Sequence, residues 1–171
     1  MRKYLVFALA VLLVGALATG ALAKGKTGPS GKSNIAHLYL HQKDSSTWEI
    51  VDGGAWGKMK YNLSGSEFKF VFNGHQLEVG WDYTLIYYPD PWPGSGLICL
   101  GSGIANGGGN VHIMGSVHTG DLPAEGDENE GAKIWLLLSS DVSCHHQMVG
   151  WDPTEYVFEY DLITFDDTDA P

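Results

Sequence analysis

Alternation of apolar and polar residues with a period of two is the feature that most constrains the fold of this chain. In residues 35–41 (IAHLYLH), His37, Tyr39 and His41 share one face, and alanine and leucine side chains occupy the other. Residues 67–73 (EFKFVFN) repeat the pattern with phenylalanines on one side. Successive side chains of a strand point to opposite faces of a sheet, so this spacing predicts strands with one buried face.

Four further segments have strand character: residues 82–88, 110–118, 132–138 and 155–165. The last changes parity near Asp161, which indicates a bulge. The 23 glycines and the turn signals between these segments leave no room for a long amphipathic helix. The sequence therefore predicts an all-β domain of about eight to ten strands. A single antiparallel β-sandwich, immunoglobulin-like or jelly-roll-like, is the first choice of architecture, and a closed barrel is the second.

Residues 1–23 contain a short positive start, an apolar run and an Ala-Leu-Ala sequence before Lys24. This order is typical of a secretory signal peptide. A retained membrane anchor is the alternative, because about 20 apolar residues can span a bilayer. The sequence predicts a flexible linker over residues 24–34 and the β-domain over residues 35–171. We expect a secreted protein, extracellular or in the cell envelope, that is not inserted in the membrane once the signal is cleaved.

Charge is unevenly distributed along the chain. Residues 24–171 hold eight lysines and twenty acidic residues, and Lys133 is the single basic residue after position 69. Phosphate backbones would repel such an acidic protein, so we expect no nucleic-acid partner. The acidic surface favours solubility outside the cell, with attraction to cations or cationic surfaces as the alternative.

Cys99 and Cys144 are the only cysteines, and two thiols in an exported domain predict one disulfide. Cys99 lies in an apolar run, so we expect it in a buried strand. Cys144 lies in a polar stretch, which predicts a loop or a strand end. Closing a loop of roughly 46 residues would stabilise the fold by about 4 kcal/mol. Two free thiols remain the alternative.

Sequence motifs assign no catalytic residue. No serine has glycine at both −2 and +2, so the nucleophile-elbow pattern is absent. His37 and His41 have the spacing of a zinc-protease helix, but they lie in a predicted strand, where two such rings are about 13 Å apart. Ser116, His118 and Asp121 are neighbours in sequence, which does not by itself make a catalytic triad.

Two segments suggest metal ions without fixing a site. Residues 144–148 (CHHQM) combine sulfur and imidazole ligands that suit copper or zinc, although a disulfide at Cys144 would remove its thiolate. Residues 121–131 (DLPAEGDENEG) resemble part of a calcium loop, but the distal glutamate is missing. The sequence therefore assigns no metal ligand and no cofactor.

An aromatic segment is the best binding candidate. Residues 87–94 (YYPDPWPG) end a predicted strand and place Trp92 between two prolines, which restrict the loop. Tyr87, Tyr88 and Trp92 are thus candidate ligand-binding residues for a sugar ring or a protein partner. Trp92 folded back onto the domain is the alternative. Asn62 begins a glycosylation sequon, Asn-Leu-Ser.

Several segments together carry a resemblance to known sequences: YTLIYYPDPWPG (83–94), LICLGSG (97–103), GGGNVHI (107–113) and YVFEYDLITF (156–165). They resemble a group of secreted archaeal and bacterial proteins to which no activity is assigned. The resemblance implies export and a compact domain. Taken with the absence of catalytic motifs, it favours a non-catalytic exported domain that binds a cell-surface glycan or protein, or has a structural role. An extracellular hydrolase whose site is assembled from distant residues, or a metal-binding domain, is the alternative.

Overall fold

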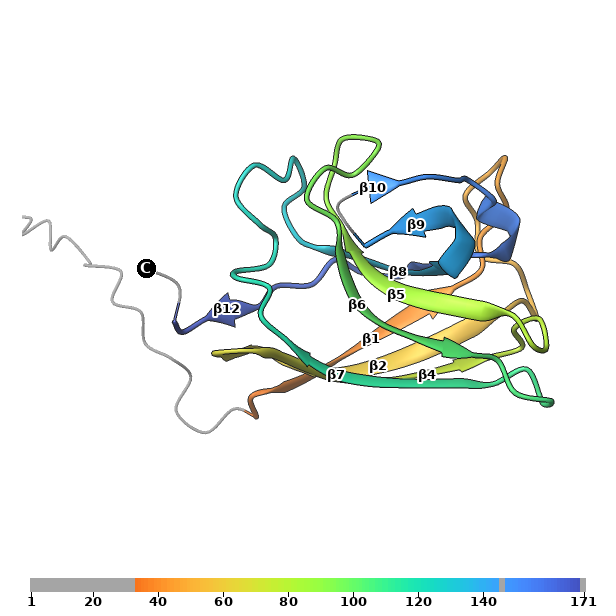
Figure 1. Cartoon of the computed structure of the whole chain (residues 1–171), viewed down its shortest axis with the longest axis horizontal. Coiled ribbons are helices and arrows are strands. Elements are labelled where there is room, and N and C mark those ends of the chain that lie inside the picture. The colour runs from red at the N-terminus through yellow and green to blue at the C-terminus, as the bar shows by residue number, and fades with distance from the viewer. Residues whose placement is uncertain (1–32, 145–146, 170–171) are drawn as a thin grey trace, which may run out of the picture. The chain divides into compact units, whose positions relative to one another are not determined.

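The computed structural model describes residues 33–144 and 147–169, which belong to one compact unit (Figure 1). The signal peptide and most of the linker expected from the sequence lie outside the described residues. The elements, in chain order, are β1 (Ile35–His41), β2 (Trp56–Asn62), β3 (Ser64–Gly65), β4 (Phe68–His75), β5 (Asp82–Tyr88), β6 (Ile98–Ile104), β7 (Val111–Val117), β8 (Lys133–Leu138), η1 (Ser139–Asp141), β9 (Val142–Ser143), β10 (Gln147–Met148), η2 (Pro153–Glu155), β11 (Val157–Glu159) and β12 (Asp166–Asp167).

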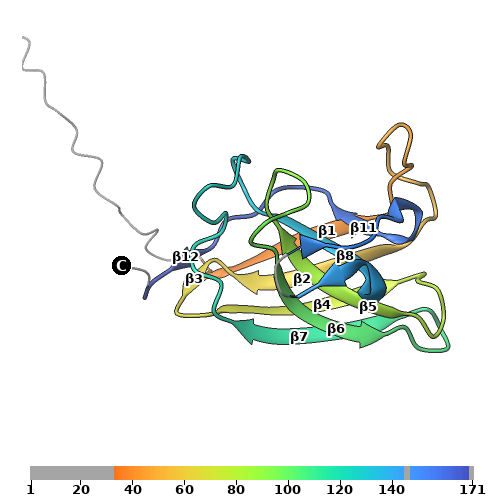
Figure 2. The same cartoon turned by 45° about the horizontal axis from the view of Figure 1, so that its top comes forward.

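Eight of the strands form one antiparallel sheet in the order β6-β5-β8-β11-β1-β2-β4-β7. The sheet curls until its two end strands, β6 and β7, meet, so it is nearly barrel-shaped (Figures 1 and 2). The all-β, antiparallel prediction is confirmed. The near-closure of one sheet corresponds to the second of the two architectures expected from the sequence.

Glycine allows the two ends of the sheet to approach each other. A Cβ atom on Gly101 of β6 would lie 2.8 Å from Cγ2 of Ile113, and one on Gly103 would lie 2.9 Å from Cγ2 of Val111. Real Cβ atoms do not come this close to carbon, so larger residues would separate β6 from β7.

The inner face of the sheet holds the main core. Register pairs Met59 of β2 with Phe72 of β4, and Tyr61 with Phe70, and all four side chains are buried. The alternation in residues 67–73 therefore places the phenylalanines inward, as predicted. Burial of apolar side chains from all eight strands on this face is the main source of stability.

A second apolar cluster covers the outer side of β5, β8 and β11. On these strands it contains Ile86, Tyr88, Trp135, Leu137 and Phe158. Met148 of β10 and the loop residues Leu97 and Tyr156 pack against them. In both views the segment with β9 and β10 lies over β5 and β8. The predicted disulfide between Cys99 and Cys144 is present, with an S–S distance of 1.98 Å, and it ties this segment to β6.

Three sequence expectations need correction. Cys99 is half-buried rather than buried, because it lies toward the rim of the outer cluster. The strand β2 was not predicted, because its lysines and glycine weaken the apolar signal although its alternation is regular. The strand expected over residues 155–165 is shorter and is interrupted near Asp161: β11 spans Val157–Glu159, and Ile163 then pairs with Ala132 through an isolated bridge.

Among the described residues, no helix has the length and apolar character needed to cross a membrane.

Candidate functional site

Three indole rings stand at the surface on the outer side of the sheet. Trp48, Trp92 and Trp151 are 49%, 55% and 44% exposed. The Trp151 ring centroid is 5.6 Å from that of Trp92 and 6.4 Å from that of Trp48. We call these three residues the tryptophan surface. Contiguous exposed apolar groups of this kind mark interaction sites in soluble proteins.

Buried aromatic rings support the tryptophan surface from below. The Trp151 ring lies 5.6 Å from Tyr156, 6.1 Å from Trp135 and 6.3 Å from Phe158, measured between centroids. Tyr88 stacks on Trp135 at 4.1 Å with an interplanar angle of 11°. The Trp151 indole is therefore anchored on a packed layer, which limits the conformational entropy that it would lose on binding.

Trp48 is presented by the loop between β1 and β2, which rises beside η2 (Figure 2). Asp44 Oδ1 accepts hydrogen bonds from the backbone N–H groups of Ser46 and Thr47, both at 2.9 Å, and Trp48 N donates to Asp44 O at 2.8 Å. Hydrogen bonds from Ser46 and Thr47 lower the pKa of Asp44 to about 2. Trp48 has φ 60°, a left-handed conformation that is rare for a bulky residue. The Asp44 turn thus holds Trp48 in a strained position at the surface.

Trp92 is presented by the loop between β5 and β6. Gly94 N donates to Pro91 O at 2.9 Å, which closes a turn around Trp92. Met148 N donates to Pro93 O at 3.1 Å and ties this turn to β10. The loop is therefore fixed from both sides, in agreement with the restriction expected from its prolines.

Trp151 lies between β10 and η2, in a segment held by Tyr156. The Tyr156 hydroxyl donates to Asp141 Oδ2 at 2.5 Å and accepts from Asp152 N at 2.9 Å. Burial, followed by the hydrogen bond to Asp141, raises the pKa of Tyr156, so the hydroxyl keeps its proton as a donor. One buried hydroxyl therefore fixes the backbone next to Trp151.

Two polar atoms lie buried without a hydrogen-bond partner among the described residues: Nε1 of Trp135 and Oε2 of Glu159. Burial raises the pKa of Glu159, and the Glu159 backbone N–H and the charge of Lys43 oppose that shift. The Glu159 carboxyl is thus easier to protonate than an exposed one.

The candidate residues from the sequence occupy different environments. Trp92 is exposed and belongs to the tryptophan surface, whereas Tyr87 and Tyr88 are buried. Tyr88 supports the surface through Trp135. Tyr87 faces the inner core, where its hydroxyl donates to Asp127 Oδ2 at 2.6 Å. Neither tyrosine ring presents a binding surface here.

Sequence reasoning missed Trp48 and Trp151, which are distant from Trp92 in the chain. The six tryptophans in 171 residues were the single hint that such a surface could exist.

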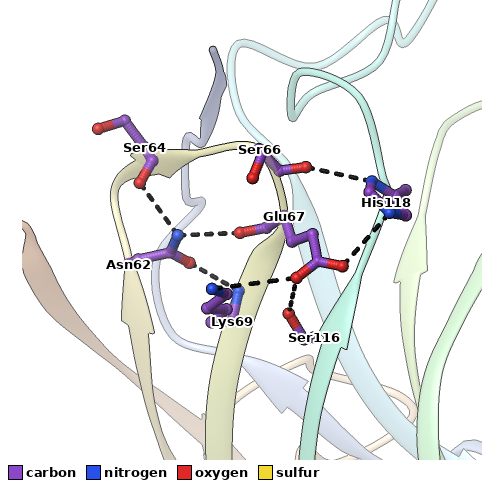
Figure 3. A network of polar contacts seen from close by, with 7 residues as sticks. All are labelled: Asn62, Ser64, Ser66, Glu67, Lys69, Ser116 and His118. Atoms are coloured by element: carbon purple, nitrogen blue, oxygen red, sulfur yellow. Dashed lines mark hydrogen bonds and ion pairs between the residues drawn. The ribbon is translucent and has the colours of Figure 1, made fainter. Parts of the chain in front are cut away.

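The groups considered for catalysis do not converge. Ser116 Oγ donates to Glu67 Oε2 at 2.5 Å, and His118 Nε2 lies 3.3 Å from Glu67 Oε1 (Figure 3). A carboxylate between serine and histidine is not the serine–histidine contact that activates a nucleophile. Asp121 Oδ1 accepts from Asp167 N instead.

The loop of residues 121–131, which resembles part of a calcium loop, uses its central carboxylate internally. Asp127 Oδ1 accepts from Asn129 N at 3.0 Å and from Asn129 Nδ2 at 2.8 Å, and Oδ2 accepts from Tyr87. Over residues 33–144 and 147–169, no three histidine, cysteine, aspartate or glutamate side chains are grouped to hold a metal ion. In the copper or zinc candidate, Cys144 is in the disulfide, and residues 145–146 lie outside the described residues.

Comparison with protein-family models, with curated proteins and with solved structures gave no match.

Proposed function

We propose that the protein is a non-catalytic, exported binding domain whose tryptophan surface binds the sugar rings of a cell-surface glycan. The observation that carries the proposal is the grouping of Trp48, Trp92 and Trp151 at the surface from three separate loops. The C–H face of a sugar ring packs on an indole, and hydroxyl groups at the ring edge stay in water.

The ring orientations narrow the ligand class. The planes of Trp92 and Trp151 make an angle of 78°, and those of Trp48 and Trp151 an angle of 41°. Rings that are not coplanar cannot lie together on the flat surface of a crystalline polysaccharide. We therefore assign a soluble glycan, bound as a bent chain or at its end, as the ligand.

Export is part of this proposal, and the disulfide supports it. Disulfides persist in oxidising compartments outside the cytosol. Cys99–Cys144 ties the segment that carries Trp151 to β6, so the oxidised state supports the tryptophan surface.

Binding to an array of soluble oligosaccharides tests the function. We expect binding that Trp92→Ala and Trp151→Ala each weaken at least tenfold, in the range of a truncated aromatic anchor. Trp81→Ala is the matched control, because Trp81 is 45% exposed but lies in the loop between β4 and β5. Equal losses in all three variants, or binding only to a protein partner, would overturn the glycan assignment.

A further inference from the structure

The outer face of the wall formed by β1, β2, β4 and β7 concentrates the basic residues of the domain. All five histidines of the described residues and three of their five lysines lie on it: His37, His41, His75, His112, His118, Lys58, Lys60 and Lys69. We call this set the histidine–lysine face.

Strand register creates the face. Tyr39 pairs with Lys58, Lys58 with Asn73, and Asn73 with His112, so one row of outward side chains crosses all four strands. The next row contains His37, Lys60, Val71 and Met114. No outward position on these four strands holds a carboxylate, although the described part of the chain contains twenty. Charge is thus segregated in three dimensions, more sharply than along the sequence.

The one carboxylate at the edge of the face is compensated (Figure 3). Glu67 accepts the hydrogen bond of Ser116 and lies 3.3 Å from His118 Nε2 and 3.9 Å from Lys69 Nζ. The hydrogen bond from Ser116, followed by the nearby His118 and Lys69, lowers the pKa of Glu67. Glu67 therefore stays ionised and offsets the charge of Lys69, and Lys58 and Lys60 keep the face positive.

A groove of about 700 Å³ runs over the same face. Ile35, Val71 and Met114 give it apolar surface, and Met114 is 69% exposed. Lys60 and Lys69 also line it, with Glu67 beside Lys69. The groove thus offers apolar contact and ammonium groups side by side.

We propose that the histidine–lysine face is a docking surface for a carboxylated polysaccharide. The apolar C–H faces of sugar rings match Val71 and Met114, and carboxylates on the rings match Lys60 and Lys69 in the same groove. Asn73 and other polar groups of the face supply hydrogen-bond partners for hydroxyls.

Charge complementarity is the reason for choosing this occupant. The remaining surface carries nearly all the acidic residues and repels a polyanion, so a polyanion can approach in only one orientation. A chain of carboxylates without sugar rings would match the lysines but not the apolar part of the groove. This site is separate from the tryptophan surface and does not rest on the proposed function.

Equilibrium binding of the protein to polygalacturonate in low salt tests the proposal. We expect binding that weakens with added NaCl and is not seen with neutral dextran. The variant Lys58→Gln/Lys60→Gln/Lys69→Gln should bind roughly tenfold more weakly, the combined effect of three exposed ion pairs. Lys43→Gln, a lysine outside the face, is the control and should change affinity less than twofold. Circular dichroism should show that both variants are folded.

Three results would overturn the proposal: equal binding of dextran, an unchanged affinity of the triple variant, or binding of poly-L-glutamate as tight as that of polygalacturonate. Binding of dextran sulfate without polygalacturonate would contradict the choice of carboxylate. Trp92→Ala/Trp151→Ala should leave polygalacturonate binding unchanged. The two binding proposals, one for the tryptophan surface and one for the histidine–lysine face, can therefore be tested separately.

Discussion

Removal of the Tyr156 hydroxyl tests how the tryptophan surface is held. Tyr156→Phe deletes the donor to Asp141 Oδ2 and the acceptor for Asp152 N while keeping the buried ring. A hydrogen bond to a charged group contributes about 1.5–3 kcal/mol, and an unsatisfied backbone N–H costs about 1–3 kcal/mol. Asp141 is half-buried and Asp152 is exposed, so water can replace part of the hydrogen bonding that the substitution removes. We expect a loss of about 2–3 kcal/mol in the free energy of unfolding.

Tyr87→Phe is a matched control, because Tyr87 makes the same pair of contacts elsewhere. Its hydroxyl donates to Asp127 Oδ2 at 2.6 Å and accepts from Ala124 N at 3.0 Å. In urea denaturation both variants should lower the midpoint by about 1–2 M. In glycan binding only Tyr156→Phe should weaken affinity, since it alone loosens the segment that carries Trp151. Equal binding by the two variants, or a stability loss below about 0.5 kcal/mol, would refute the reasoning.

The control also has a defined pH dependence. Burial alone would raise the pKa of Asp127, but hydrogen bonds from Tyr87, Asn129 and the Asp90 backbone lower it overall. A carboxylate with a lowered pKa stabilises the folded state above its unfolded pKa of about 3.9 and loses that effect as the pH falls below it. Tyr87→Phe should therefore cost less stability at pH 3 than at pH 7.

Three further changes test other parts of the structure. Cys99→Ser/Cys144→Ser opens a link between residues 45 apart, so unfolding in urea should show a loss of about 4 kcal/mol, and an unchanged midpoint would contradict this. The pKa of Asp44 near 2 means that its turn is lost only as the pH falls toward 2, so the NMR signal of the Trp48 indole should titrate there and not near pH 4. Gly101→Val should destabilise the domain by about 1–3 kcal/mol, measured by thermal unfolding, because a side chain there collides with β7.

Local sequence pattern was sufficient where one strand carries its own signal. Ile35–His41 and Asp82–Tyr88 were predicted to the residue, since alternation or apolar richness is visible within seven positions. The pairing of Cys99 with Cys144 also followed, because two thiols leave one choice. The strand Trp56–Asn62 was missed, since its outward lysines dominate its composition.

The tryptophan surface was only partly predictable. Trp92 attracted notice because prolines flank it, but nothing local distinguishes Trp48 or Trp151 from core aromatics. Their grouping depends on three loops that meet over the outer side of β8 and β11, and on the buried Trp135 between them and the sheet. Contacts of this kind are properties of the folded chain.

The sequence by itself determined the all-β class, the inward and outward residues of most strands, and the disulfide, because side-chain alternation is a short-range property of extended backbone. Tertiary structure decided which strands are neighbours. That choice depends on long-range pairing and closure, which leave no mark in a window of ten residues. It brought the histidines of β1, β4 and β7 beside the lysines of β2 and β4 on one face of an otherwise acidic domain, and it joined three distant indoles into one surface.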